Sequence, residues 1–157
     1  MTEPTGNSGV IAPPPLLNLG KLIVAFVLHW LWPGPILGHA TWEVWCGVVL
    51  GALGLGLGLW GRSKMISAGT NINPLKPTTS IVTSGPFRFT RNPLYVGMTL
   101  LYLGLTIGFD TWWGIALLIP LIIVMHVGVI RREERYLEGK FGDEYRQYRS
   151  TVARYVG

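Results

Sequence analysis

Four apolar runs divide this chain, and they constrain its fold more than any other feature of the sequence. The runs are Leu16–Trp32, Trp42–Trp60, Leu94–Phe109 and Trp112–Ile130. A membrane-spanning helix needs about 20 mainly apolar residues, so each run has roughly the length of one span. Charged residues make up 13% of the chain, about half of the fraction usual in soluble domains. The sequence therefore predicts an all-α integral membrane protein with about four transmembrane helices.

The connections between the runs predict a single domain with one long polar linker. Asp110 and Thr111 alone separate the third run from the fourth, so these two runs should form an antiparallel helical hairpin. After Ile130 the sequence becomes highly charged, which favours a helical tail that leaves the membrane. The predicted segments are a flexible tail (1–15), two N-terminal helices (16–61), the linker (62–92), and the hairpin with the C-terminal tail (93–157).

The distribution of basic residues predicts the orientation of the chain. All 13 lysines and arginines lie at the start of the first run, in the linker or after Ile130. With four spans these three pieces share one side of the membrane, and the positive-inside rule assigns that side to the cytoplasm. We therefore expect both termini and the linker to be cytoplasmic, with the bacterial inner membrane as the host membrane.

Several classes of site are disfavoured by composition. Cys46 is the single cysteine, so one chain has no disulfide and no cysteine metal cluster, and no His, Cys and carboxylate group has metal-ligand spacing. A net charge of +5 could indicate nucleic-acid binding, but basic loops of a membrane protein explain it better. We therefore expect no metal and no nucleic acid.

Glycines recur on the second run at a spacing that lets another helix approach closely. Gly47/Gly51 and Gly54/Gly58 are two small-xxx-small pairs. This face allows helix packing within the chain and also a homodimer.

The most distinctive polar stretch is Thr83–Gly97, with the sequence TSGPFRFTRNPLYVG. A Gly-Pro turn precedes Arg88 and Arg91, and Asn92-Pro93 then fixes the start of the third helix, because proline at the first helical position needs no N–H partner. This stretch brings arginines, an amide and an aromatic ring to the membrane surface, next to the charged tail. The arginines also fit ordinary positive-inside charges, and Glu133 and Glu134 of the tail also fit a solvated helix face.

The order of SGPFRFTRNPLYVG, an apolar hairpin and EERYLEGKFGDEYRQYRSTVARY resembles the isoprenylcysteine carboxyl methyltransferases and the related phospholipid N-methyltransferases. The resemblance covers residues 71–155. It implies a multi-helix membrane enzyme that binds S-adenosyl-L-methionine at the cytosolic side and takes a lipophilic acceptor from the bilayer.

The resemblance also implies site residues. Cofactor contacts fall on the segment before the Gly-Pro turn, on the aromatic residue after it, on the motif at the start of the third helix, and on one glutamate of the tail. These residues are Thr79, Ser80, Ile81, Val82, Phe87, Asn92, Pro93, Leu94, Tyr95 and Glu133. The residues expected to act in catalysis are Glu133, Tyr95, Asn92 and Arg91.

Two positions depart from the family pattern. Asn92 stands where the eukaryotic carboxyl methyltransferases usually have histidine, and it can donate hydrogen bonds but cannot take a proton at neutral pH. Val129 aligns with a substrate-binding arginine, so the acceptor need not be a prenylcysteine carboxylate, although Arg131 or Arg132 could replace that arginine. Glu134 remains the alternative to Glu133 as the cofactor contact.

The sequence thus predicts transfer of a methyl group from S-adenosyl-L-methionine to a lipophilic or lipid acceptor at the membrane–cytosol interface. An amine acceptor must lose a proton, for which Glu133, Glu134, His126 and Tyr95 are candidates. Two alternatives stay open. One is an NADPH-dependent enzyme similar to sterol reductases, and the other is a non-catalytic membrane scaffold that uses the glycine face of the second helix. The sequence does not decide the acceptor, or whether oxygen, nitrogen or sulfur is methylated.

Overall fold

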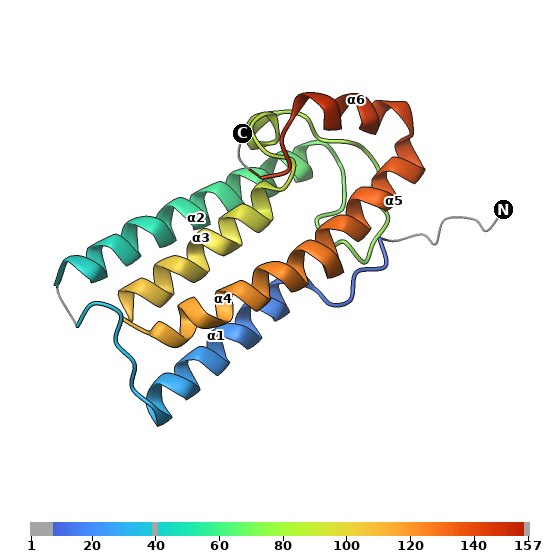
Figure 1. Cartoon of the computed structure of the whole chain (residues 1–157). Helices are drawn as coiled ribbons and strands as arrows, with labels where there is room; N and C mark the ends of the chain where they lie inside the picture. The colour runs from blue at the N-terminus through green and yellow to red at the C-terminus, as the bar shows by residue number, and fades with distance from the viewer. Residues whose placement is uncertain (1–7, 39–40, 156–157) are drawn as a thin grey trace.

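The computed structural model describes residues 8–38 and 41–155, and the regular structure in these residues is helical throughout (Figure 1). The longer helices are α1 (Pro14–Leu31), α2 (Thr41–Ser67), α3 (Pro93–Gly108), α4 (Trp112–Met125), α5 (Arg131–Phe141) and α6 (Asp143–Thr151). A 3₁₀ turn, η1 (Gly85–Arg88), lies in the linker, and a π-helical segment, η2 (His126–Ile130), joins α4 to α5. The prediction of an all-α chain is confirmed.

Three helical segments of the described chain are long and apolar enough to cross a membrane. They are α1, α2 and the continuous segment Trp112–Phe141 that α4, η2 and α5 form. α3 is also apolar but has 16 residues, fewer than any of these three segments. The prediction of an integral membrane protein with about four transmembrane helices is confirmed.

α2 extends beyond its apolar run. It continues to Ser67, whereas the sequence predicted that the linker begins at residue 62, so the linker proper begins at Ala68. A fall in hydropathy shows where a helix leaves the apolar membrane core, but it does not show where the helix ends. The residues that follow include Arg62, Lys64 and Met65, which are all good helix formers. The extra turns bring Arg62 and Met65 to the site described below.

The bundle contains two closely packed pairs of helices, α2 with α3 and α1 with α4 (Figure 1). A Cβ atom added at Gly47 would lie 2.5 Å from the carbonyl oxygen of Gly104, and one added at Gly54 would lie 2.5 Å from that of Gly97. The two backbones are therefore too close for any side chain at these positions. The glycine face of α2 thus packs against α3 of the same chain.

A buried carboxylate holds the loop between α1 and α2 against the turn between α3 and α4. Asp110 accepts backbone hydrogen bonds from Ile36 (2.6 Å), Leu37 (2.9 Å) and Gly38 (3.2 Å). Several N–H donors stabilise a buried carboxylate that would otherwise be costly to remove from water. This contact fixes the end of the bundle away from the linker.

The linker and the C-terminal segments gather at the other end of the bundle, which we call the basic end because most lysines and arginines lie there (Figure 1). Gly142 has φ +56° and separates α5 from α6, so that α6 folds back toward the linker. The buried rings of Phe87, Tyr145 and Tyr148 form a small core there. The Tyr148 hydroxyl donates a 2.7 Å hydrogen bond to the Phe87 carbonyl, which attaches α6 to η1.

Candidate active site

The first turn of α3 and the first turn of α5 meet through a tyrosine–glutamate pair. Pro93 is the first residue of α3, and Tyr95 follows two positions later. The Tyr95 hydroxyl donates a 2.6 Å hydrogen bond to Oε2 of Glu133. A short bond to a carboxylate is among the stronger hydrogen bonds in proteins. This pair provides a proton donor and a proton acceptor at the basic end of the bundle.

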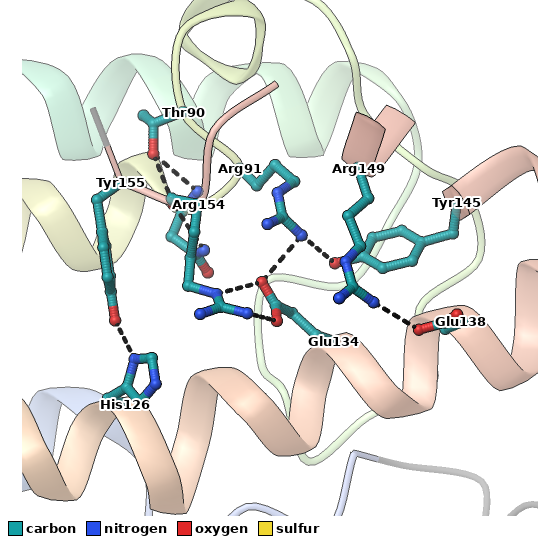
Figure 2. Close-up of polar contacts among 10 residues, drawn as sticks. Thr90, Arg91, His126, Glu134, Glu138, Tyr145, Arg149, Arg154 and Tyr155 are labelled. Atoms are coloured by element: carbon teal, nitrogen blue, oxygen red, sulfur yellow. Dashed lines mark hydrogen bonds and ion pairs between the residues drawn. The ribbon is translucent and has the colours of Figure 1, made fainter. Parts of the chain in front are cut away.

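Glu134, the next residue, faces a different set of partners (Figure 2). Arg154 donates to both of its carboxylate oxygens, from Nε at 2.9 Å and from Nη2 at 2.8 Å. Arg91 Nη1 lies 2.9 Å from Oε1 of the same carboxylate. Successive helical residues point about 100° apart. Glu134 therefore holds two arginines in place, while Glu133 is left to Tyr95.

Arg91 has a buried donor that no described residue engages. Its Nη1 also donates to the Tyr145 hydroxyl at 3.3 Å, but its buried Nε has no hydrogen-bond partner among the described residues. The side chain is only 7% exposed. A buried guanidinium N–H without an acceptor is costly, so this atom indicates a place where a ligand with an acceptor atom can bind.

The residues before α3 also hold the segment that follows α6. The Asn92 side-chain amide and the Thr90 hydroxyl both donate to the Arg154 carbonyl, at 2.9 Å and 3.1 Å. The Arg91 backbone N–H donates to the Ala153 carbonyl at 3.0 Å. These bonds explain how Arg154, 20 residues beyond Glu134, reaches that carboxylate.

Two adjoining cavities lie beside these residues. The small cavity, of about 70 Å³, lies between the linker, α5 and α6, and the large cavity, of about 360 Å³, lies between the linker and the starts of α1 and α3. Both are lined by Met65, Phe87, Arg91, Asn92 and Glu133. These shared residues make the two cavities neighbouring parts of one site.

A third space opens along α3 and α4. This lateral groove, of about 280 Å³, is lined by Tyr95, Val96, Thr99, Leu100, Leu121, Ile122, Met125, Ile130 and Tyr155. None of these residues is charged, and Thr99 uses its hydroxyl to bond the Tyr95 carbonyl at 2.9 Å. Tyr95 lines both the lateral groove and the large cavity. The Tyr95–Glu133 pair thus lies where a double cavity with charged side chains meets an uncharged groove.

Comparison with known proteins places this site in a family. The family model described as phospholipid methyltransferase matches residues 42–144, which is more than half of the chain. This chain belongs to the phospholipid methyltransferase family. The match includes α2, the linker, α3, α4 and α5, and therefore both members of the Tyr95–Glu133 pair.

Two known proteins are similar in sequence to this methyltransferase-family chain. The chain is 33% identical over 141 residues to the cobalt-zinc-cadmium resistance protein CzcN of Cupriavidus metallidurans, covering 87% of this chain and 62% of that protein. It is 40% identical over 66 residues to an uncharacterized protein of Haemophilus influenzae, covering 40% of this chain and all of that protein. The chain thus spans less than two thirds of the length of its longer relative. No solved structure matches the chain.

The structure brings most of the predicted site residues of this family member to the two cavities. The small cavity contains Ser80, Ile81 and Val82; the large cavity contains Pro93, Leu94 and Tyr95; and Phe87, Arg91, Asn92 and Glu133 line both. Thr79 lines neither, because its hydroxyl donates to the Gly69 carbonyl (2.9 Å) and its side chain is exposed. Roles for these residues in binding and catalysis stay predictions.

Other candidates lie away from the two cavities. Val129 is fully buried in the core, and Arg132 donates to the Gly9 carbonyl at 2.9 Å. Arg88 is exposed and lines a separate open surface groove. His126 Nδ1 lies 2.5 Å from the Tyr155 hydroxyl (Figure 2), which lines the lateral groove.

Several residues of the site were not anticipated from the sequence. They are Met65, Tyr145 and Tyr148, Arg154, which pairs with Glu134, and Pro13, Pro14 and Pro15 at the start of α1. The i, i+3 spacing of Tyr145 and Tyr148 on a charged helix was a usable signal, because it puts two aromatic rings on one face. Burial raises the pKa of both tyrosine hydroxyls above the ordinary value of 10.0, so they stay protonated in mildly alkaline solution as well.

Proposed function

We propose that this methyltransferase-family protein transfers a methyl group from S-adenosyl-L-methionine to a lipophilic or lipid acceptor at the membrane–cytosol interface. The observation that carries the proposal is the position of the Tyr95–Glu133 pair, at the meeting point of a double cavity that contains charged side chains and an uncharged groove. A polar cofactor and an apolar acceptor need such a junction, because their reacting atoms must come within about 3–3.5 Å of each other.

The residues of the two cavities fit the chemistry of this cofactor. Its carboxylate suits the unpartnered Nε of Arg91, its ammonium group or ribose hydroxyls suit Glu133, and its adenine ring suits the face of Phe87. The small cavity of about 70 Å³ is below the range of roughly 300–1,000 Å³ for ligand pockets, whereas the large cavity of about 360 Å³ lies within it. The fit therefore requires the large cavity.

When bound, S-adenosyl-L-methionine would supply an electrophilic methyl group. The chain's own contribution is to position the acceptor, exclude water and accept a proton. The apolar lining of the lateral groove keeps the acceptor in a dry environment. If the acceptor atom carries a proton, the Tyr95 hydroxyl can take it while passing its own proton to Glu133. If the acceptor is a carboxylate or a thiolate, the pair has an orienting role.

The proposed orientation places the basic end in the cytoplasm, as the positive-inside rule favours. A bacterial inner membrane is the proposed host. The test of the function is transfer of a radiolabelled methyl group from the cofactor into organic-extractable material by purified protein in lipid nanodiscs containing a bacterial lipid extract. The proposal predicts protein-dependent label in the organic extract that disappears with Tyr95→Phe and Glu133→Gln. If the wild-type protein binds the cofactor but no label enters the extract, the result counts against the proposal.

A further inference from the structure

The segment before α1 is folded across the basic end of the bundle, outside the family match at residues 42–144. We call residues 8–13 the N-terminal strap. Both Ser8 Oγ and the Ser8 backbone N–H donate to the Pro74 carbonyl, at 2.7 Å and 3.4 Å. Ser8 and Val10 are buried, and Val10 joins the core formed by α3, α4 and η2. The strap is therefore attached to the linker at one end.

The other attachment is to the π-helical segment between α4 and α5. The Ile11 N–H donates to the Gly128 carbonyl at 3.2 Å, and Arg132 Nη1 donates to the Gly9 carbonyl at 2.9 Å. The Ile11 side chain fills the space above Gly128, where an added Cβ atom would lie 2.9 Å from Ile11 Cγ1. π-Helical turns occur frequently at functional sites. Here the turn provides the surface that receives the strap.

The strap leads directly into the wall of the large cavity. Pro13, at the end of the strap, and Pro14 and Pro15, in the first turn of α1, line this cavity. So does Pro74, to which Ser8 is bonded. The remaining walls are helices α2, α3 and α5 and the linker segment that packs on α6. The strap contributes Pro13 to this wall, and it is held by a few hydrogen bonds, the buried Val10 and the contact of Ile11 with Gly128.

We propose that the N-terminal strap is a movable wall of the cofactor chamber, and that release of Ile11 and Gly9 from Gly128 and Arg132 admits and discharges S-adenosyl-L-methionine. This inference rests on the proposed function. The large cavity has the volume that a nucleoside-sized ligand needs, and the strap reaches its wall through Pro13, next to Pro14 and Pro15 of α1. A wall held by a few hydrogen bonds opens far more often than a packed helix does.

The first test measures access to the chamber without any cofactor. In full-length Cys46→Ser protein, Met98→Cys places one thiol in the large cavity, and a water-soluble maleimide reports its exposure. Gly128→Ala removes the space for Ile11, and Arg132→Gln removes the bond to Gly9. Each should raise the labelling rate about tenfold, the factor that the loss of about one net hydrogen bond produces, because Arg132→Gln removes one such bond and Gly128→Ala displaces Ile11, whose N–H donates another. The matched controls are Gly56→Ala, where a Cβ atom meets nothing within 4 Å, and Arg135→Gln, whose Nε donates to the Arg131 carbonyl within its own helix.

The second test measures exchange of the cofactor. Dissociation of labelled S-adenosyl-L-methionine from protein that retains Met98 should be accelerated by the same two variants and unchanged in the two controls. If the wild-type protein binds the cofactor but neither rate responds, the strap inference fails and the proposed function stands. If the wild-type protein does not bind the cofactor, the proposed function fails. The large cavity is then not a cofactor site, whatever the maleimide labelling rates of the variants are.

Discussion

The Tyr95 hydroxyl donates a 2.6 Å hydrogen bond to the Glu133 carboxylate, although 38 positions separate the two residues in the chain. The bond joins α3 to α5 across the antiparallel hairpin, at the end where the linker and the C-terminal residues converge. Glu134, the residue after Glu133, forms ion pairs with Arg91 and Arg154. Two adjacent glutamates thus have different tasks, which yield separable predictions.

Replacing Tyr95 by phenylalanine should impair turnover more than cofactor binding. The variant keeps the ring and loses the proton donor, and a positioned proton-transfer group is worth about 10²–10⁴ in rate. We expect methyl transfer at saturating cofactor to fall about 100-fold or more for an acceptor that loses a proton. Tyr136→Phe is the control, because Tyr136 contacts Lys140 on the outer face of α5. Unchanged turnover in Tyr95→Phe with such an acceptor would show that the pair takes no part in proton transfer.

Replacing Glu134 by glutamine should destabilise the fold. Glu134 and Arg91 are buried, with side chains 9% and 7% exposed, and removing one partner of a buried pair costs about 3–5 kcal/mol. The comparison is Glu138→Gln, which breaks the partly exposed pair with Arg149 and should cost less than about 1 kcal/mol. Thermal unfolding in one detergent measures both. Equal shifts in the two variants would contradict the structural role of Glu134.

The glycines of α2 should differ sharply in their tolerance of substitution. Gly54→Val forces a side chain into a space where a Cβ atom would lie 2.5 Å from backbone atoms of α3, whereas Gly56→Val meets nothing within 4 Å. Overpacking costs about 1–3 kcal/mol, and more when the obstacle is backbone. We expect Gly54→Val to lower the yield of folded protein in size-exclusion chromatography and Gly56→Val to leave it unchanged. The reverse order would place the helix interface on the other face of α2.

Alkaline pH should destabilise the attachment of α6. Burial raises the pKa of Tyr145 and Tyr148 above the ordinary value of 10.0. Between pH 10 and the raised values, the unfolded chain has lost these protons and the folded chain has kept them, so the free energy of unfolding falls as pH rises. Below pH 10 the contribution is complete. The free energy of unfolding, measured from pH 9 to 11, should show this decline in the wild type and a shallower one in Tyr148→Phe. Parallel profiles would contradict the role of the buried Tyr148 hydroxyl in this decline.

The sequence predicted the fold well because apolar length and charge distribution act locally. Each of the four helices follows from one apolar run, and the two-residue connection at Asp110 specified the hairpin. The end of α2 was misplaced by six residues, from Gly61 to Ser67, because polar residues continue a helix past the point where hydropathy falls. The glycine spacing predicted close helix packing but could not choose between a partner chain and α3.

The site was predicted in part, for a physical reason. Residues near the Gly-Pro turn and the start of α3 belong to one continuous stretch, and nine of the ten predicted cofactor contacts line one of the two cavities. The contributions of Arg154, Met65 and the strap depend on contacts between distant segments, such as the 2.9 Å bond from Asn92 to the Arg154 carbonyl. No local pattern encodes these contacts. Which of Glu133 and Glu134 contacts the cofactor stays a prediction, and no local pattern shows that the two arginines reach Glu134.

Calorimetric titration of the purified full-length protein with S-adenosyl-L-methionine, in detergent, tests the central claim most directly. NADPH serves as the control ligand, and Glu133→Ala and Glu138→Gln as the paired variants. The claim predicts saturable binding of the methyl donor that Glu133→Ala abolishes and Glu138→Gln preserves, with no binding of NADPH. Binding of NADPH in place of the methyl donor, or of neither ligand by folded protein, would contradict it.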